Sequence, residues 1–183
     1  MASVLSEITP ELRSWIEQQK MFFVASAPLA EAGLVNCSPK GMDSFRVLGP
    51  TEVAYLDLTG SGAETLGHIR ENQRVTFMFC AFDGLPNIVR LHGRGSIVTA
   101  QMPEWTSLRG LFPDYPGARS IIRAQLLRIS DSCGYAVPRY DHREDRDVLL
   151  RWASNKGEAG VRAYQQQNNL RSLDGLAALD PEA

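Results

Sequence analysis

Six or seven segments with the composition of β-strands follow one another between about residues 21 and 133, and only two short helical patterns interrupt them. Short turns join most of these segments, as between "MFFVASA" and "LVNCS", and later at Asp83-Gly84-Leu85-Pro86. Parallel sheets need a long crossover, usually a helix, between successive strands, and this chain lacks that alternation. The sequence therefore predicts a mainly β fold, a closed or nearly closed antiparallel barrel.

Helical patterns flank the predicted barrel. Thr9-Pro10-Glu11 combines a capping residue, a proline in the first turn and an acid near the positive end of the helix dipole, which predicts a helix start. A second helical pattern runs from Arg143 to about Asn168, and the last ten residues are expected to form a frayed tail. We expect a single domain over 1–183, with the barrel at about 21–133 and a helical C-terminal extension at about 143–170.

The segment from Val75 to Phe82 is apolar at nearly every position. A barrel strand normally alternates between an apolar inner face and a polar outer face, so this strand needs cover on its outer side as well. Either the C-terminal helices or a second copy of the chain could provide that cover. Of the two, the homodimer is the favoured interpretation.

Composition limits the partners and the compartment. The formal net charge is −2, so no overall attraction to nucleic acid or to an anionic membrane is built in. No apolar run reaches the length of a membrane span, and "MASVLSEITPE" lacks the pattern of a signal peptide. Cys37, Cys80 and Cys133 are odd in number and far apart, as is typical of reduced thiols in a cytoplasmic protein.

The stretch "VNCSPKGMDS" starts like a strand and then becomes rich in polar groups. One interpretation is a solvent-facing Pro39-Lys40-Gly41 turn after a strand end that Asn36 and Ser38 cap. The other is a ligand site, because Asn36, Ser38 and Lys40 share one strand parity and would point to the same face, with Val35 and Cys37 on the other. Such a row suits the edge of a heteroaromatic or phosphate ligand.

The stretch "LTGSGAET" follows a strand and opens a helix. Gly60 and Gly62 would let backbone N–H groups converge, and Thr59, Ser61 and Thr65 add hydroxyls, so the loop could hold a phosphate at the helix N-terminus. An ordinary strand-to-helix turn with a serine cap accounts for the same residues. The loop lacks the lysine of a Walker motif and the third glycine of a dinucleotide fingerprint.

Other catalytic classes find no support in the residue pattern. His68, His92 and His142 have no partners at metal-ligand spacing and are interpreted as structural or surface residues. No G-x-S-x-G elbow is present, and Cys133 has no evident histidine partner, which argues against a covalent hydrolase.

The order of motifs carries a resemblance. A helix, "FFVASAP", "GLVNCSPKG", "VAYLDLTGSG" and "VRLHGRGSIV" follow one another over about residues 10 to 135. This arrangement resembles the pyridoxamine 5′-phosphate oxidase-like family of FMN-binding split barrels. The strongest matches are Ser38-Pro39-Lys40-Gly41, the junction from Leu66 to Val75, and Arg90 with Gly93. The stretch "SCGYAVPRYDHREDRDVLLRWA" resembles a subgroup of unassigned substrate.

The resemblance implies an antiparallel split β-barrel of Greek-key type with C-terminal helices, and a homodimer with one FMN at each of two interface clefts. It places the flavin ring along "VNCSPK" and the flavin phosphate near "TGSG". The cofactor-binding residues that it implies are Asn36, Cys37, Ser38, Lys40, Tyr55, Leu56, Thr59, Ser61, Gly62 and Arg90. It assigns no catalytic residue.

The function implied is that of an FMN-dependent oxidoreductase acting on a small molecule by hydride transfer at the flavin N5, with a reduced nicotinamide as the electron donor. True pyridoxamine phosphate oxidases carry an Arg and a Ser-Arg-Lys where this chain has Val35 and Gly60-Ser61-Gly62, which argues against vitamin B6 oxidation. The alternative is a non-catalytic flavin- or haem-binding barrel used for storage or sensing. Haem would need His68 or His92 as an axial ligand.

Overall fold

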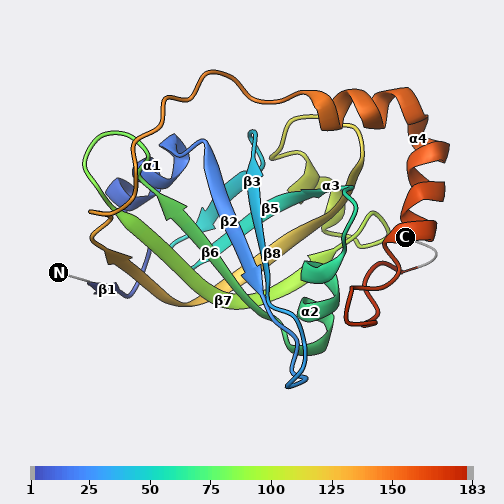
Figure 1. Cartoon of the computed structure of the whole chain (residues 1–183), viewed down its shortest axis with the longest axis horizontal. Helices are drawn as coiled ribbons and strands as arrows, with labels where there is room; N and C mark the ends of the chain where they lie inside the picture. Colours follow the sequence, from blue (N-terminus) through green and yellow to red (C-terminus); the bar gives the residue numbers. More distant parts are fainter. Residues whose placement is uncertain (1–2, 181–183) are drawn as a thin grey trace.

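The computed structural model describes residues 3–180. Its strands belong to one sheet, coloured from blue to yellow-brown in Figure 1. They are β1 (Val4–Leu5), β2 (Met21–Ser26), β3 (Asn36–Gly41), β4 (Phe45–Gly49), β5 (Glu52–Leu58), β6 (Arg74–Cys80), β7 (Ile88–Val98) and β8 (Ala118–Ser132). The helices are α1 (Pro10–Gln18), α2 (Glu64–Asn72), α3 (Trp105–Arg109) and α4 (Val148–Asn168).

The strands run in the order β3-β2-β6-β7-β8-β5-β4, every neighbouring pair is antiparallel, and β1 adds to β8. The sheet curls into a barrel, and its two ends, β3 and β4, are not hydrogen-bonded to each other. A mainly β, antiparallel split barrel with appended helices is therefore confirmed. The short strand β1 was not predicted.

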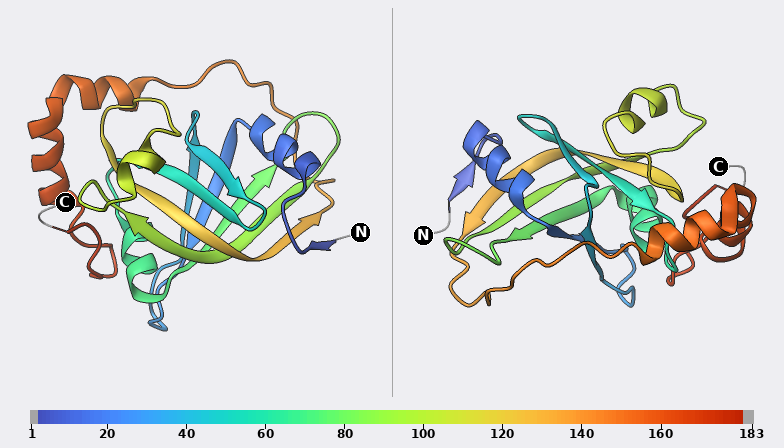
Figure 2. Two further views of the ribbon diagram at one scale, coloured as in Figure 1. Left: turned by 180° about the vertical axis from the view of Figure 1, so that it is seen from behind. Right: turned by 90° about the horizontal axis from the view of Figure 1, so that it is seen from above.

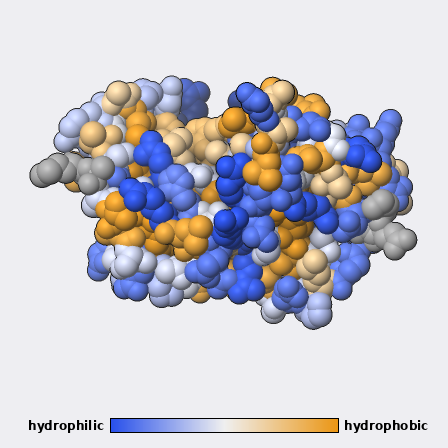
Figure 3. Space-filling model, turned by 90° about the horizontal axis from the view of Figure 1, so that it is seen from below, coloured by the Kyte–Doolittle hydropathy of each residue, from blue (hydrophilic) through white to orange (hydrophobic). Residues whose placement is uncertain are grey.

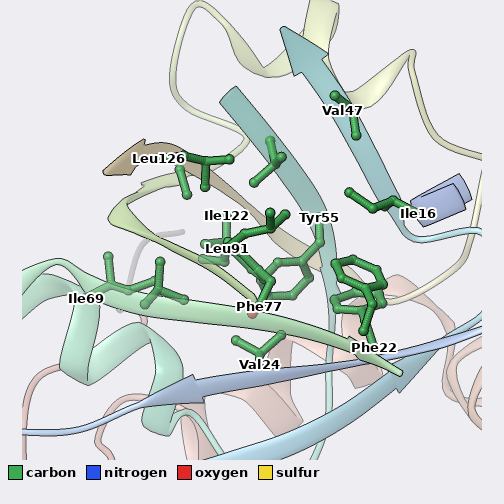
Figure 4. Packing of buried hydrophobic residues seen from close by; sticks show 14 of the residues in the cluster. Ile16, Phe22, Val24, Val47, Tyr55, Ile69, Phe77, Leu91, Ile122 and Leu126 are labelled. Atoms are coloured by element: carbon green, nitrogen blue, oxygen red, sulfur yellow. The ribbon is translucent and has the colours of Figure 1, made fainter. Parts of the chain in front are cut away.

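Aromatic side chains fill the barrel interior (Figure 4). Phe22 on β2 stacks on Phe79 of β6 with ring centroids 5.6 Å apart, and it meets Tyr55 of β5 edge-on at 5.9 Å. Phe77 is also fully buried, so Phe77 and Phe79 share the inner face of β6. Alternation with a period of two places these residues inside the barrel.

Helix α1 begins as the sequence predicts. The Thr9 side chain accepts a hydrogen bond from the Leu12 backbone N–H, and Pro10 is the first helical residue. Ile16 is buried against the core, and Leu12 and Trp15 pack beside it. The capping residue and the apolar face together place α1 at one end of the barrel (Figure 2).

Of the two interpretations of "VNCSPKGMDS", the solvent-facing turn at Pro39-Lys40-Gly41 is wrong. These residues continue β3 and pair with Phe23, Phe22 and Met21 of β2. Proline has no N–H to donate to a ladder, but β3 is an edge strand, so no bond is lost on its open side. The chain turns after Gly41, where Met42 takes a positive φ of 62°.

Three helical or terminal predictions also need correction. Helix α4 begins at Val148 rather than Arg143, and Gly157 inside it is non-helical, with φ 67° and ψ 168°. The second of the two short helical patterns between residues 21 and 133, in "MPEWTSLRGLF", is limited to α3, residues Trp105–Arg109. The last ten residues are not a frayed tail within the described part, because Ala178 and Leu179 are buried and Asp174 is hydrogen-bonded. Residues 181–183 lie outside the described residues.

An extended segment, residues 133–147, leads from β8 to α4, which lies at the end of the molecule opposite α1 (Figures 1 and 2). Helix α4 therefore does not cover the outer face of β6, where Thr76 and Met78 stay half-exposed. On the face shown in Figure 3, hydrophobic residues form several patches with hydrophilic residues between them. None of the helices within residues 3–180 has the length and apolar character needed to cross a membrane.

Candidate functional site

Three polar residues of β3 form the centre of the candidate site. Asn36, Ser38 and Lys40 are half-buried on one face of the strand, while Cys37 and Pro39 are exposed on the other. Their partners on β2 are Ser26, Val24 and Phe22, which are buried, so the row faces the barrel side of the sheet. The shared parity extends to Lys40 because the strand continues through Pro39. We call Asn36, Ser38 and Lys40 the β3 row.

Helix α2 supports the β3 row through hydrogen bonds. The Asn36 Nδ2 donates to Thr65 Oγ1 at 3.0 Å and to Ser26 Oγ at 3.4 Å. Ser38 Oγ donates to Asn36 Oδ1 at 2.9 Å. His68, one turn after Thr65 on α2, joins its Nδ1 to Ser26 Oγ at 2.9 Å. The Asn36 side chain is thus held from both ends of its amide.

Lys40 ends the row with a positive charge. Its ammonium group makes no hydrogen bond or ion pair with any residue in the described range 3–180. It does act on Asp57 of β5, whose carboxylate is fully buried. Burial by itself raises the pKa of Asp57, but Arg119 and, more weakly, Lys40 bring it below the usual value. Lys40 is therefore a cation available to a ligand beside β3.

Asp57 and Arg119 form a buried ion pair next to the site. Arg119 donates from Nε to Asp57 Oδ2 at 2.7 Å and from Nη2 to Oδ1 at 3.2 Å, and Ser120 Oγ donates to the same carboxylate at 3.1 Å. The remaining guanidinium nitrogen donates to the Gly62 carbonyl at 2.9 Å. Three of the five N–H donors of Arg119 are thus used inside the protein, and its side chain is only 5% exposed.

The "TGSG" loop is held by contacts to residues distant in the sequence. The Thr59 hydroxyl donates to the Gly117 carbonyl at 2.8 Å and accepts from Gln165 of α4 at 2.7 Å. Asn169 donates to the Gly60 carbonyl at 3.1 Å. A Cβ added at Gly62 would lie 2.2 Å from Glu64 Oε2, so a carboxylate sits directly against the loop.

The helix after this loop has no serine cap. Its N-cap is Ala63, which makes no side-chain capping bond, and Ser61 is exposed. The interpretation of the loop as a serine-capped turn is thus wrong in its detail. The connections to Gln165 and Asn169, more than 100 residues away in the sequence, hold the loop instead.

Three further residues implied by the resemblance lie on β5 and β7. Tyr55 and Leu56 are buried on opposite faces of β5, Tyr55 in the barrel interior and Leu56 in a second cluster with Phe112. Arg90 lies half-buried on the outer face of β7, where it donates to Ser132 Oγ at 2.9 Å. Leu56 and Arg90 thus face away from the row, whereas Tyr55 lies on the row's side of the sheet, with its hydroxyl near Thr65.

Sequence reasoning missed three residues that surround the row: Asp57, Arg119 and Asp174. Their partners are distant in sequence, by 62 residues for Asp57–Arg119 and by 106 for His68–Asp174. The one usable local signal was the spacing of Thr65 and His68, since residues three apart on a helix share a face. Nothing local marked Asp174.

His68 and His92, the two candidate haem ligands, differ in their surroundings. Both ring nitrogens of His68 are engaged, by Ser26 at 2.9 Å and by Asp174 at 3.2 Å, and the residue is fully buried. His92 lies on the outer face, where its Nδ1 meets Thr76 Oγ1 at 3.1 Å. Within residues 3–180, no group of three His, Cys, Asp or Glu side chains could hold a metal ion.

Comparison with known proteins agrees with the split barrel and identifies the family. A family model described as pyridoxamine 5′-phosphate oxidase matches residues 8–133. The pyridoxamine 5′-phosphate oxidase family protein ustO of Aspergillus flavus is 39% identical over 191 aligned residues, which cover 94% of this chain and 76% of that protein. The chain belongs to the pyridoxamine 5′-phosphate oxidase family.

Solved structures agree on the fold. HupZ of Group A Streptococcus is 21% identical, with a TM-score of 0.54 over 67% of this chain and 91% of that chain. A pyridoxamine 5′-phosphate oxidase homologue from Lactobacillus delbrueckii is 15% identical, with a TM-score of 0.51 over 69% of this chain and 97% of that one. At these identities the likeness concerns the fold alone.

Proposed function

We propose that this protein is an FMN-dependent oxidoreductase acting on a small molecule, with the flavin ring edge bound along the β3 row. Family membership supports a flavin. The observation that carries the proposal is the row itself: three polar side chains on one face of an edge strand, ending in an ammonium group that makes no hydrogen bond or ion pair within residues 3–180. Buried polar groups normally have partners, so a half-buried row with spare capacity suits a ligand.

The residues present fit one part of FMN better than the other. The carbonyl and N–H groups of a flavin ring edge match hydroxyl, amide and ammonium partners. At the "TGSG" loop, Arg119 is buried in an ion pair with Asp57 and Glu64 lies against Gly62, an arrangement poorly suited to a phosphate. The proposal therefore rests on the ring edge, and we expect modest affinity for FMN.

A bound flavin supplies hydride transfer at N5, and the protein supplies orientation and electrostatics. Lys40 would stabilise negative charge on the ring edge beside it, because a fixed cation in a partly dry site costs no reorganisation. Asn36 and Ser38 would fix the orientation of the ring. No described residue of the row is a general acid or base in position to move a substrate proton, so we assign no catalytic residue.

Assembly and location belong to the same proposal. A homodimer would cover the outer face of β6 and enclose the flavin between two copies, with reduced nicotinamide as the electron donor. A reducing cytoplasm suits Cys37, Cys80 and Cys133, none of which is in a disulfide.

Titration of the purified protein with FMN, followed by visible absorbance and flavin fluorescence, tests the proposal. We expect saturable binding, and Lys40→Ala should weaken it about tenfold or more, since a hydrogen bond to a charged group contributes about 1.5–3 kcal/mol. Lys156→Ala, which removes the same charge from an exposed position on α4, is the matched control and should leave binding unchanged.

Three outcomes would overturn parts of the proposal. If the protein does not bind FMN, FMN is not its cofactor. A haem spectrum after incubation with haem would favour the haem-binding alternative through His92. Bound flavin that reduced nicotinamides fail to bleach in stopped flow would leave a binding protein without turnover. Equal affinities of wild type and Lys40→Ala would remove the β3 row from the site.

A further inference from the structure

A series of hydrogen bonds, here called the relay, links the β3 row to the C-terminal segment. It runs from Ser38 to Asn36, then to Ser26, then to His68 and finally to Asp174. Apart from Asp174 and the half-buried Asn36 and Ser38, its members are buried, with His68 at 0% exposure. The relay crosses the sheet edge and α2. The donor-to-acceptor direction of its hydrogen bonds determines whether the β3 row donates to a ligand or accepts from it.

The direction starts at Asp174. The Leu34 backbone N–H at 3.0 Å, and then His68, hold the pKa of this carboxyl below its usual value. Asp174 is therefore a carboxylate at neutral pH, and a carboxylate only accepts hydrogen bonds. The His68 Nε2, 3.2 Å from Asp174 Oδ2, must carry the proton. A neutral imidazole with its proton on Nε2 has a lone pair on Nδ1.

The lone pair on His68 Nδ1 takes the Ser26 hydrogen over 2.9 Å. The Ser26 oxygen can then only accept, and the Asn36 amide turns its NH₂ group to it and to Thr65. That leaves Asn36 Oδ1 to accept the single hydrogen of Ser38 at 2.9 Å. Each hydroxyl has one hydrogen, so each step fixes the next.

We propose that Asp174 and His68 are positioning residues that make Ser38 a pure acceptor toward the ligand. Lys40, two residues on, is a pure donor on the same face. An acceptor followed by a donor matches a ligand edge that carries an N–H beside a carbonyl, the edge of a cyclic imide. The part of this inference that concerns the ligand rests on the proposed function, since the pyrimidine ring of a flavin has such an edge. The direction of the hydrogen bonds in the relay does not depend on the proposed function.

Ser26, His68 and Asp174 have the composition of a hydrolase triad but not its arrangement. Ser26 is 6% exposed, and its hydroxyl accepts from Asn36 while it donates to His68. A nucleophilic serine needs an open oxygen beside an oxyanion hole. The three residues therefore act on Asn36 and Ser38 rather than on a substrate.

The relay direction has a direct spectroscopic test. In protein with ¹⁵N-labelled histidine and no ligand, His68 should give the signature of a neutral ring protonated at Nε2. Asp174→Asn should broaden or shift that signature, because an amide can donate as well as accept. The matched control is Asp145→Asn, which makes the same change in the exposed His142–Asp145 pair and should leave His68 unchanged. A ring protonated at Nδ1, or at both nitrogens at neutral pH, would overturn the relay.

Ligand selectivity tests the part of the inference that concerns the ligand edge. Wild type should bind FMN about tenfold or more tightly than FMN methylated at N3, since an unpaired buried acceptor costs about 1–3 kcal/mol. Ser38→Ala should bring the two affinities close together, and Asp174→Asn should narrow their ratio while Asp145→Asn keeps it. Ser38 is half-buried on an edge strand, so this variant should fold even if Asp174→Asn does not.

The outcomes separate the inference from the proposed function. Equal binding of the two flavins by wild type, or an unchanged ratio in Ser38→Ala, would refute the imide edge while FMN binding itself stands. No binding of either flavin would refute the proposed function and the part of the inference that concerns the ligand together. The histidine spectrum would still decide the direction of the relay.

Discussion

Asp57 is the residue on which the polar end of the barrel depends. Its carboxylate is 2% exposed, paired with Arg119 at 2.7 Å, and the Arg119 side chain is 5% exposed. Removing one partner leaves the other charge buried and uncompensated. We expect Asp57→Asn to destabilise the protein by about 3–5 kcal/mol, measured by urea unfolding. Asp114→Asn, in the exposed pair with Arg109, is the control and should cost at most about 1 kcal/mol.

The same pair predicts the acid sensitivity of the fold. Burial raises the pKa of Asp57, but Arg119, Lys40 and Ser120 together lower it more, so the folded pKa lies below the unfolded value of about 3.9. The stabilisation by Asp57 is therefore present above about pH 3.9 and is lost as the pH falls through the folded pKa. Urea unfolding should show Asp57→Asn approaching wild type as the pH drops below 4. A constant difference down to pH 2 would contradict this.

At the scale of elements, the pairing of β7 with β8 depends on a glycine. The register shifts between His92 and Gly93, which leaves Leu127 of β8 without a partner on β7. A Cβ at Gly93 would lie 2.6 Å from the Gln125 carbonyl oxygen, a backbone atom that cannot move aside without distorting the strand. The bulge thus lets the two longest strands approach closely.

Gly93→Ala should therefore lower the free energy of unfolding by about 1–3 kcal/mol through overpacking. Gly60→Ala is the control, since a Cβ there meets nothing within 4 Å. Chemical denaturation of both variants beside wild type would check the prediction. A Gly93→Ala protein as stable as the control would mean that the ladder adjusts without cost.

At the scale of the whole molecule, we expect the outer face of β6 to bind a second copy of the chain. Met78 and Thr76 are half-exposed there, next to the half-buried Phe23 of β2, and α4 lies elsewhere. An obligate dimer interface is about as apolar as a core and typically buries about 2,000 Å² or more. We expect wild type to be a dimer by light scattering, and Met78→Asp to be a monomer or aggregate without FMN.

The matched control is Met102→Asp, at a 40% exposed position outside the sheet, which should keep the dimer mass. Circular dichroism should confirm that each variant is folded before its mass is interpreted. A folded Met78→Asp monomer that binds FMN as wild type does would refute both the dimer interface and the shared cleft.

Local patterns in the sequence were enough for much of the fold. The hairpins and the start of α1 follow from turns, periods and caps that act over a few residues. The common face of Asn36, Ser38 and Lys40 is of the same kind, because it depends only on strand parity. The predicted turn at Pro39 failed because edge position, which permits a proline in a strand, is a property of the sheet.

Only the tertiary structure decided what surrounds the row. Asp57 pairs with Arg119 and His68 with Asp174, at sequence separations of 62 and 106 residues. Gln165 donates a hydrogen bond to the Thr59 hydroxyl, also 106 residues away. Such pairs leave no periodic signal, since nothing in the local sequence of either partner depends on the other. The polar row on β3 was therefore determined by the sequence, while the direction of its hydrogen bonds, and the closure of the loop beside it, came from contacts that form only when the chain folds.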